Sequence, residues 1–333
     1  MNYEELVERS KGRYFDRITV LTKDIFQEVA NLADILNAAP CNLRMVSDRT
    51  DGGLTRCGQE ISYEQRQASF YFSNTEICVV QPVSGNTIYR EYLDQYGEGI
   101  CCVRERIPAA EYEAALKKYE EKGLKTAQVL ENDQCRMAWF DIRNPLGILF
   151  SIVADDSVFP EKTVENASRI AQINITTPDV RKTIEQVTEL LEIGPWEVGC
   201  QNKRTVTNSG FLADGELRDV EFEFYVAILV CGNIEWEAIQ PFKGPLVYND
   251  FLARRGIGYH HILMEAPESD WEKVESEYQS KGIQMSYKGQ VGPVQWCYMD
   301  TESRIHFFME LRTDAVMDQL PDGYLCYMYP EQE

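Results

Sequence analysis

The chain has 333 residues, of which 44% are hydrophobic and 26% charged; this is an ordinary globular composition, and the length allows two domains of roughly 150 residues each. The formal net charge of −21 argues against nucleic acid and anionic membranes as partners, because both need a basic surface, but a small anionic substrate is still compatible. The longest apolar run, 225–231, is too short to span a bilayer, and the acidic N-terminus lacks a secretory pattern, so we expect a cytoplasmic protein.

The first predicted strand, 17–21, is a short β-branched run that leads to Asp24. Asp is a good helix N-cap because its carboxylate accepts a hydrogen bond from a free backbone N–H, so a helix is predicted over 25–36. Alternating apolar residues then predict strands around 68–71 and 78–80. The rest of this half is predicted to be a short helix over 87–95, a strand over 100–104, an amphipathic helix ending at Lys122-Gly123, and strands over 136–141 and 146–153.

The same order of elements returns in the second half of the chain. A strand over 172–176 leads to Asp179, and the helix predicted over 180–191 ends before Gly194 and Pro195. The later elements are predicted as strands over 220–229 and 234–239, a helix over 246–254, a strand over 259–264, a helix ending at Lys281-Gly282, and strands over 294–299 and 305–311.

The two halves are copies of one another. Residues 78–151 align without a gap on residues 237–310, at a constant offset of about 159 positions, and residues 17–24 align on 172–179 after a small shift. The matched pairs include Gln81-Pro82 with Gln240-Pro241, Gly85 with Gly244, Gly97 with Gly256, and Lys122-Gly123 with Lys281-Gly282. Each copy contains two β-α-β-β-β units, so the predicted fold class is α+β, with four tandem βαβββ modules. We place domains at 12–154 and 169–314, a linker at 155–168 and a C-terminal tail, whose structure we do not predict, at 315–333.

Ten cysteines are scattered along the chain without CxxC pairs or the spacing of a disulfide framework. We interpret most of them as small core residues that the cytoplasm keeps reduced. The adjacent pair Cys101 and Cys102 is the exception. A redox pair or a soft-metal site is one interpretation of these thiols, and plain packing is the one we favour.

Polar residues inside apolar strands, or where a loop enters one, are the candidates for function. They are Gln172, Glu237, His260, His261, His306 and Glu310. Burying a carboxylate without a partner is costly, so two in the strands of one domain need a common reason. Solvent-facing placement, or salt bridges to Arg304 or Arg312, is the alternative explanation. Together, an amide oxygen, an imidazole and two carboxylates suit Zn, Mn, Co, Ni or Fe, with positions left open for water or substrate.

Three motifs in the second copy carry a resemblance to a known family. They are Glu237-Ala-Ile-Gln-Pro, Tyr248-Asn-Asp-Phe-Leu, and Gly-Ile-Gly-Tyr-His-His-Ile at 256–262. With these motifs the chain resembles the vicinal oxygen chelate superfamily, which includes glyoxalase I, methylmalonyl-CoA epimerase and the extradiol dioxygenases, and it is most similar to the epimerase branch. The resemblance covers nearly the whole chain as two tandem copies, and it implies domains whose curved mixed sheets form cups.

In this family the metal ligands come from the first and last strands of each module. The resemblance therefore implies a metal site of Gln172, Glu237, His261 and Glu310, with His261 preferred because the ligand directly precedes the Ile. Gln172 departs from the His that is usual in many bacterial members, is similar to some glyoxalase I enzymes, and argues against the two-His-one-carboxylate set of dioxygenases. The first copy has Arg17, Cys78, Cys102 and Ser151 at these positions, so we expect it to keep the fold without the metal.

The resemblance implies a metal-dependent epimerase or isomerase that removes a proton from the carbon next to a carbonyl, through a metal-stabilised enolate. Glu310 is the first candidate for the ligand that also moves the proton, and Glu237 is the second. A glyoxalase I-like lyase and a non-catalytic small-molecule binding or resistance protein are the alternatives, and a dioxygenase is disfavoured.

The expected cofactor is a divalent metal: Zn, Co, Ni, Mn or Fe. The expected substrate is a small molecule with adjacent oxygens, such as an acyl thioester or a 2-oxo compound. Four modules in one chain reproduce the pairing that many relatives obtain by dimerising, so we expect an internal pseudo-dimer, as a monomer or a homodimer.

Overall fold

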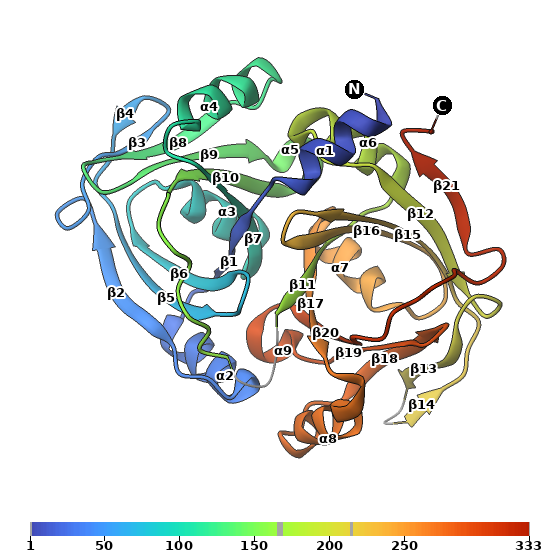
Figure 1. The fold of residues 1–333 in the computed structure, drawn as a ribbon. Helices are drawn as coiled ribbons and strands as arrows, with labels where there is room; N and C mark the ends of the chain where they lie inside the picture. Colours follow the sequence, from blue (N-terminus) through green and yellow to red (C-terminus); the bar gives the residue numbers. More distant parts are fainter. Residues whose placement is uncertain (1, 165–168, 214–215, 333) are drawn as a thin grey trace. The chain divides into compact units, whose positions relative to one another are not determined.

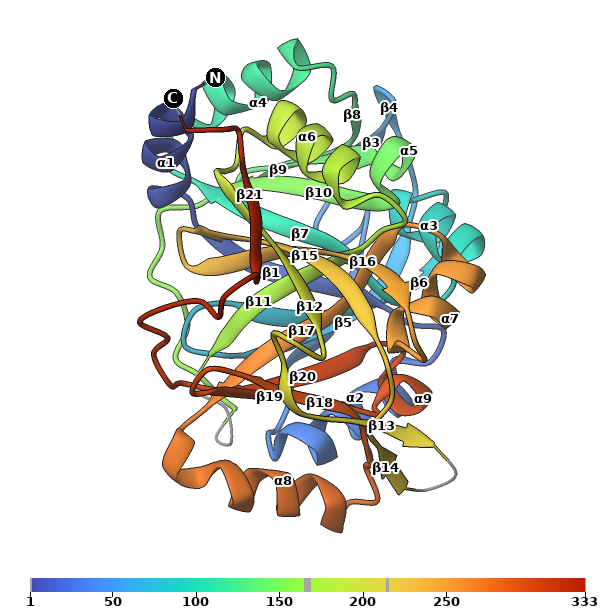
Figure 2. The ribbon, with the colours of Figure 1, turned by 90° about the vertical axis from the view of Figure 1, so that its right-hand side faces the viewer.

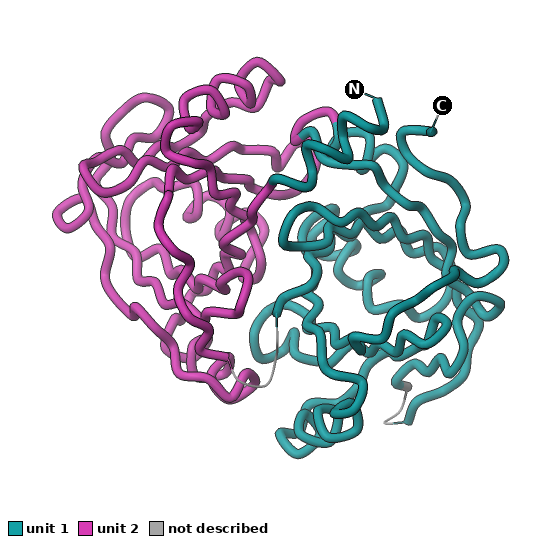
Figure 3. Tube along the Cα trace, viewed as in Figure 1, with its two compact units in different colours: residues 1–12, 166–188, 192–333 teal, residues 13–165, 189–191 magenta. Residues whose placement is uncertain are grey.

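The computed structural model describes residues 2–164, 169–213 and 216–332. The chain divides into two compact units (Figure 3). We call Arg13–Glu165 with Glu189–Leu191 the N-terminal unit, and Met1–Gly12, Asn166–Thr188 and Glu192–Glu333 the C-terminal unit. Of the predicted linker 155–168, residues 165–168 lie outside the described residues.

The N-terminal unit is built on a 10-stranded curled sheet with the strand order β2-β5-β6-β1-β7-β10-β9-β8-β3-β4 (Figure 1). Its elements are β1 (Phe15–Leu21), α2 (Ile25–Leu36), β2 (Cys41–Ser47), β3 (Leu54–Arg56), β4 (Gln59–Glu60), β5 (Glu64–Tyr71), β6 (Glu76–Ser84), α3 (Ile88–Tyr96), β7 (Gly99–Ile107), α4 (Tyr112–Glu121), β8 (Thr126–Glu131), β9 (Arg136–Ile142), α5 (Arg143–Leu146) and β10 (Ile148–Ala154). Each module closes on itself, because its first strand pairs in parallel with its last: β1 with β6, and β7 with β10. The two first strands then pair antiparallel, which joins the modules into one sheet.

The C-terminal unit repeats this arrangement on an 11-stranded sheet with the order β14-β13-β18-β19-β20-β17-β11-β16-β15-β12-β21. Its elements are α1 (Tyr3–Lys11), β11 (Ile170–Thr176), α6 (Val180–Leu191), β12 (Trp196–Asn202), β13 (Thr207–Ala213), β14 (Glu216–Arg218), β15 (Glu223–Cys231), β16 (Ile234–Lys243), α7 (Val247–Arg255), β17 (Gly258–Ala266), a 3-10 turn η1 (Glu268–Asp270), α8 (Trp271–Ser280), β18 (Met285–Val291), β19 (Val294–Met299), α9 (Glu302–Ile305), β20 (Phe308–Thr313) and β21 (Leu325–Tyr329). Here β11 pairs in parallel with β16, and β17 with β20, while β11 and β17 are antiparallel. The predicted α+β fold of tandem βαβββ modules is confirmed.

The helices that follow the first strand of each copy begin where the sequence predicts. Asp24 Oδ1 accepts hydrogen bonds from Phe26 N at 3.1 Å and Gln27 N at 3.2 Å, and α2 spans exactly the predicted residues. Asp179 Oδ1 accepts from Lys182 N at 3.0 Å at the start of α6. Within the described ranges, no helix has the length and apolar character needed to cross a membrane.

The last strand of each copy begins later than predicted. A short helix, α5 or α9, precedes β10 or β20 and ends on a residue with left-handed backbone, Gly147 at φ 68° or His306 at φ 64°. The left-handed residue breaks the extended run, so the strands start at Ile148 and Phe308 rather than at the apolar residues before them.

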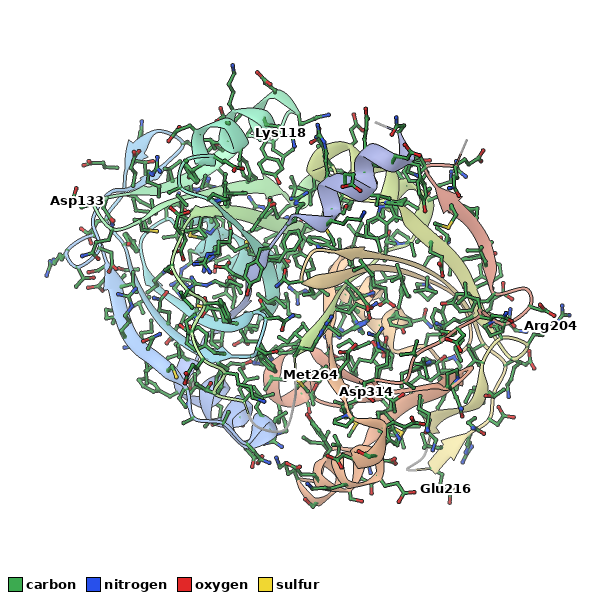
Figure 4. The ribbon with its side chains drawn as sticks, in the orientation of Figure 1. Lys118, Asp133, Arg204, Glu216, Met264 and Asp314 are labelled. Atoms are coloured by element: carbon green, nitrogen blue, oxygen red, sulfur yellow. The ribbon has the colours of Figure 1, made fainter. Side chains whose placement is uncertain are left out.

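Each unit has an apolar core to which aromatic side chains of a helix contribute. Tyr89 and Tyr92 of α3 belong to the core of the N-terminal unit, together with Trp139. In the C-terminal unit Tyr248 of α7 packs in the same way with Tyr298 and other aromatic residues. Figure 4 shows side chains filling the inside of both sheets. Any polar group inside these cups is therefore held against an apolar wall.

Among the elements of the C-terminal unit that were not predicted are its first helix and its last strand. Helix α1 buries Leu6, and its Ser10 Oγ donates a 2.7 Å hydrogen bond to the Gly194 carbonyl. Strand β21 pairs antiparallel with β12, along which it runs in Figure 2. The C-terminal tail is thus part of the sheet. Just before β21, Tyr324 is buried, with its ring against the backbone of Gly199 in β12.

Substituting Gly199 with Ala should destabilise this attachment. A Cβ at position 199 would lie 2.4 Å from Tyr324 Cε1, so the ring and the tail must shift. We expect the free energy of unfolding, measured by urea denaturation, to fall by about 1–3 kcal/mol, the usual effect of overpacking. Gly12→Ala is the control, because nothing lies within 4 Å of the added carbon and the φ angle there is −86°. Equal stability of both variants would show that the ring does not pack there.

Candidate metal centre

The four sequence-predicted site residues lie on the four adjacent central strands of the C-terminal unit. The strand order β20-β17-β11-β16 places Glu310, His261, Gln172 and Glu237 on neighbouring strands in that sequence. Met264, labelled in Figure 4, lies three residues beyond His261 on β17 and locates this strand. The topology therefore brings together residues that are up to about 140 positions apart in the chain.

Glu237, His261 and Glu310 form a compact buried cluster. His261 Nε2 lies 3.2 Å from Glu237 Oε2 and 3.1 Å from Glu310 Oε2. One potential ligand atom from each residue lies within 4.8 Å of the other two. His261 is 0% exposed, and the two glutamates are 6% exposed. In residues 2–164, 169–213 and 216–332 this is the one group of three or more His, Cys, Asp or Glu side chains with such geometry.

The cluster is electrostatically strained without a cation. Burial raises the pKa of Glu237 above its ordinary value, and the hydrogen bond to His261 offsets only part of this rise. Burial alone would lower the pKa of His261, but its close contacts with Glu237 and Glu310 outweigh that effect and raise it. Two buried carboxylates that share one imidazole thus leave negative charge without full compensation.

The donor set fits a divalent metal. Glu310 Oε2 is buried and, among the described residues, accepts no well-aligned hydrogen bond although it lies near His261. An unsatisfied buried carboxylate oxygen is costly unless a cation uses it. Imidazole nitrogen and carboxylate oxygen are both ligands of Zn, Mn, Fe, Co and Ni. The buried Glu–His–Glu cluster can bind a divalent metal.

A small cavity opens onto the cluster. Its volume is about 90 Å³, and Gln172, Glu237 and Glu310 contribute to its lining. Aromatic residues form much of the remaining wall: Phe224, Tyr248, Trp296, Tyr298 and Tyr324. Gln172 is 1% exposed and lines this cavity from the first strand of the unit. The cavity is large enough for only a small reacting group.

The other two histidines lie outside the cluster. His260 stacks on Phe308 with ring centroids 4.9 Å apart, and its Nδ1 lies 2.9 Å from Nδ1 of His261. Burial lowers the pKa of His260 well below its ordinary value, so the ring that contacts His261 is neutral. His306 ends α9. Of the alternative partners for the glutamates, Arg312 instead binds Glu235 and Glu265, at 2.8 Å each.

Sequence reasoning missed the residues that support the cluster. Asn174 Nδ2 donates a 2.9 Å hydrogen bond to Glu237 Oε2, and Thr176 Oγ1 donates to Asn174 Oδ1 at 2.8 Å. Tyr298 OH lies 3.2 Å from His261 Nε2 and 2.9 Å from Tyr248 OH. Asn174 had a detectable signal: it is two residues after Gln172, so it shares the inner face of β11.

Removing this support should weaken metal binding. We expect Asn174→Ala to lower the metal affinity of the protein by about 10–100-fold, because an unanchored Glu237 loses its preset orientation. Competition with a chromogenic chelator measures this affinity. Asn249→Ala is the control, since that side chain is exposed and its Nδ2 donates a 2.9 Å hydrogen bond to the Gly244 carbonyl. Unchanged affinity in Asn174→Ala would mean that Glu237 is not a ligand or needs no anchor.

The N-terminal unit has no such cluster among its described residues. Cys102 Sγ lies 3.4 Å from Ser151 Oγ, and both are buried, as is Cys78. Burial raises the pKa of Cys102 to about 12, so this thiol stays protonated. Arg17 instead forms an ion pair with Glu76.

Solved structures share this fold over nearly the whole chain. A mutant of 4-hydroxymandelate synthase from Streptomyces coelicolor matches with a TM-score of 0.57 and 11% identity, over 93% of this chain and 95% of that one. A xylose isomerase-like TIM barrel/4-hydroxyphenylpyruvate dioxygenase fusion protein matches with a TM-score of 0.50 and 13% identity, over 94% of this chain and 50% of the fusion. A 2,2',3-trihydroxybiphenyl 1,2-dioxygenase from Sphingomonas wittichii strain RW1 has a TM-score of 0.49 and 12% identity, over 94% and 92%.

These similarities concern the fold. They agree with the tandem vicinal-oxygen-chelate architecture that the sequence predicts. No family model matches the sequence, and the search of curated proteins found no match. At 11–13% identity, the chemistry must be argued from the residues of this chain.

Proposed function

We propose that the C-terminal unit is a metal-dependent epimerase or isomerase that moves a proton at the carbon next to a carbonyl. The observation that carries this proposal is the buried Glu237–His261–Glu310 cluster at the wall of a small cavity. Gln172 completes the proposed set of four ligands, because its amide is buried and lines the same cavity. When bound, a divalent metal supplies Lewis-acid stabilisation of negative charge on the substrate oxygens.

Glu310 is the better candidate for the group that accepts the proton. Glu237 is held by the hydrogen bond from Asn174, whereas Glu310 Oε2 accepts no comparable bond among the described residues. A carboxylate that moves a proton needs an oxygen free to approach the substrate carbon. Glu237 therefore has the more fixed, ligand-like environment, and Glu310 the more adaptable one.

The remaining wall positions the substrate and excludes water. Tyr298 OH lies 3.2 Å from His261 Nε2, and Tyr248 OH donates a hydrogen bond to Tyr298 OH. Burial raises the pKa of both phenols well above the ordinary value, so both stay protonated. Met317 and Tyr324, from the tail, cover part of the cavity. A volume of about 90 Å³ accepts the reacting end of a substrate with two adjacent oxygens, such as the acyl end of a thioester or a small 2-oxo compound.

Three other functions differ from this proposal in the substrate, in the set of metal ligands or in the need for a proton acceptor. A glyoxalase-type lyase uses the same proton transfer, so only the substrate distinguishes it. A dioxygenase with Fe(II) is disfavoured because the usual facial triad has two histidines and one carboxylate, whereas this cluster has one histidine and two carboxylates. A binding protein would need no proton acceptor and would show no exchange chemistry.

The test combines metal content with proton exchange. Protein purified without added metal is analysed for its elements, and then incubated in D₂O with 2-methyl-3-oxo acyl thioesters, 2-oxo sugars and hemithioacetals. We expect one divalent metal per chain and deuterium at the carbon next to the carbonyl of one class. Metal without exchange, together with oxygen consumption on a catechol, would replace the proposal with the dioxygenase. Absence of both metal and exchange would favour a binding protein.

A further inference from the structure

The cup of the N-terminal unit also contains a cavity, with a volume of about 260 Å³. Three of its four charged lining residues are arginines, Arg17, Arg44 and Arg104, and the fourth is Asp51. The rest of the wall mixes amides with apolar groups, among them Gln65, Gln128, Tyr63, Met137 and Trp139. All its lining residues belong to the N-terminal unit, and none of them belongs to the Glu237–His261–Glu310 cluster.

The two copies differ in the sign of the charge that they place in the cup. Arg17 occupies the position of Gln172, and Arg104 that of Leu263, in the alignment of the copies. In the same alignment Cys78 occupies the position of Glu237, and Ser151 that of Glu310. The N-terminal cup has thus lost the groups that attract a cation and has gained two that attract an anion.

Arg17 and Arg104 are each held by an ion pair with an acidic side chain. Arg104 donates from Nε and Nη2 to the two Asp16 oxygens, at 2.8 Å each, and Arg17 Nε is paired with Glu76. The two arginines are cross-strand partners of β1 and β7, so their guanidinium groups come from adjacent points of the sheet. Their side chains are only 21% and 10% exposed. Buried cations fixed in this way are preorganised, because no side-chain freedom remains to be lost on binding.

Each guanidinium still has N–H groups to offer. Within the described residues Arg17 has Glu76 as its hydrogen-bond partner, and Arg104 has Asp16, with Glu76 Oε1 3.5 Å from its Nη2. A guanidinium has five N–H donors and remains charged at any relevant pH. Donors not used by Glu76 and Asp16 can therefore bind an anionic ligand in the cavity that both residues line.

Arg44 is the third cation that lines the cavity, and Asp51, the acidic lining residue, already has partners of its own. Arg44 Nη1 lies 3.3 Å from Asp51 Oδ1, and Asp51 Oδ2 also accepts a 2.5 Å bond from Thr50. Asn132 and Gln134 add two amide side chains to the same wall. They flank Asp133, which is labelled in Figure 4. Trp139 and Tyr63, 5% and 2% exposed, supply flat apolar surface in the lining of the same cavity.

We propose that this cavity binds a small organic carboxylate, with its carboxylate on Arg17 and Arg104 and its apolar part against Trp139 and Tyr63. Guanidinium groups bind carboxylates through strong charge-assisted hydrogen bonds. The apolar wall favours an organic acid over inorganic phosphate, which has no apolar part to bury.

The test uses 4-fluorobenzoate as the probe, followed by fluorine NMR with the full-length protein. We expect saturable binding, which inorganic phosphate at the same concentration displaces weakly. Arg17→Gln combined with Glu76→Gln removes the buried ion pair as a whole, so neither partner is left unpaired. This double variant should bind the probe at least about tenfold more weakly. Arg44→Gln should show a smaller loss, and Arg49→Gln, an exposed arginine of the same unit that does not line the cavity, none.

His261→Asn serves as the second control, because it disables the proposed metal centre and should leave probe binding unchanged. Circular dichroism establishes that each variant is folded. Binding that is lost in His261→Asn, or retained in full by the Arg17/Glu76 double variant, would place the carboxylate elsewhere and overturn the proposal. So would the absence of saturable probe binding, or tighter binding of phosphate than of the probe.

Discussion

Replacing Glu310 with Gln is expected to lower the rate of deuterium exchange by about two to four orders of magnitude, the usual contribution of a general base. Gln keeps the volume and one oxygen ligand but cannot accept a proton. The reason to expect the loss here is the buried Oε2 of Glu310, which lies 3.1 Å from His261 Nε2 but accepts no well-aligned hydrogen bond from the described residues. The measurement is the rate of deuterium incorporation into whichever substrate class the wild type exchanges, at saturating metal.

Two comparisons separate the role of base from that of ligand. The metal content of Glu310→Gln shows whether the metal still binds when this position carries an amide, as Gln172 does in the proposed set. Glu272→Gln, on the exposed face of α8, controls for a general effect of removing one negative charge. Full exchange activity in Glu310→Gln with bound metal would exclude Glu310 as the base, and the same test would then pass to Glu237.

Metal binding is expected to require His261 and to release a proton. In the metal-free protein burial raises the pKa of Glu237, so a fraction of this carboxyl is protonated at a pH where an exposed glutamate is not. A ligand must be deprotonated, so the metal displaces that proton. The pKa of His261 is raised as well, and its ring must also lose a proton to bind the metal. Metal affinity should therefore rise with pH through the raised pKa values of Glu237 and His261 and fall as the pH drops below them. Calorimetric titration of the metal in two buffers of different ionisation enthalpy counts the protons released.

His261→Asn should reduce the metal affinity by more than about 100-fold, beyond the effect expected for a supporting residue. The matched control is His306→Asn: His306 lies outside the cluster, and Asn tolerates the left-handed backbone, φ 64°, at that position. Equal metal affinity of the two variants, or affinity that does not change with pH, would show that the metal binds elsewhere.

Several features of the fold could be predicted because they depend on neighbouring residues. Asp24 and Asp179 start helices through bonds to backbone N–H groups two or three residues away. The internal repeat then predicted the module order. Element ends that depend on the backbone of one residue, such as the late start of β20 after His306, were predicted too early.

The supporting residues of both cavities could not be predicted in this way. Asn174 and Glu237 are 63 positions apart, and their hydrogen bond depends on the register of β11 against β16. Arg104 reaches the floor of the N-terminal cavity because β7 pairs with β1, and its contact with Asp16 joins residues 88 positions apart. The tail pairs with β12 through contacts between residues about 130 positions apart, so its composition gave no local signal.

The sequence by itself determined that the chain is a duplicated α+β fold and that the second copy keeps a set of polar residues which the first has replaced. Those conclusions rest on periodicity, spacing and residue type, which are local properties. Only the tertiary structure decided that Glu237, His261 and Glu310 share one buried cluster while Arg312 binds other acids. Strand order and register set which side chains face one another, and both result from pairing between distant segments rather than from the residues of any one strand.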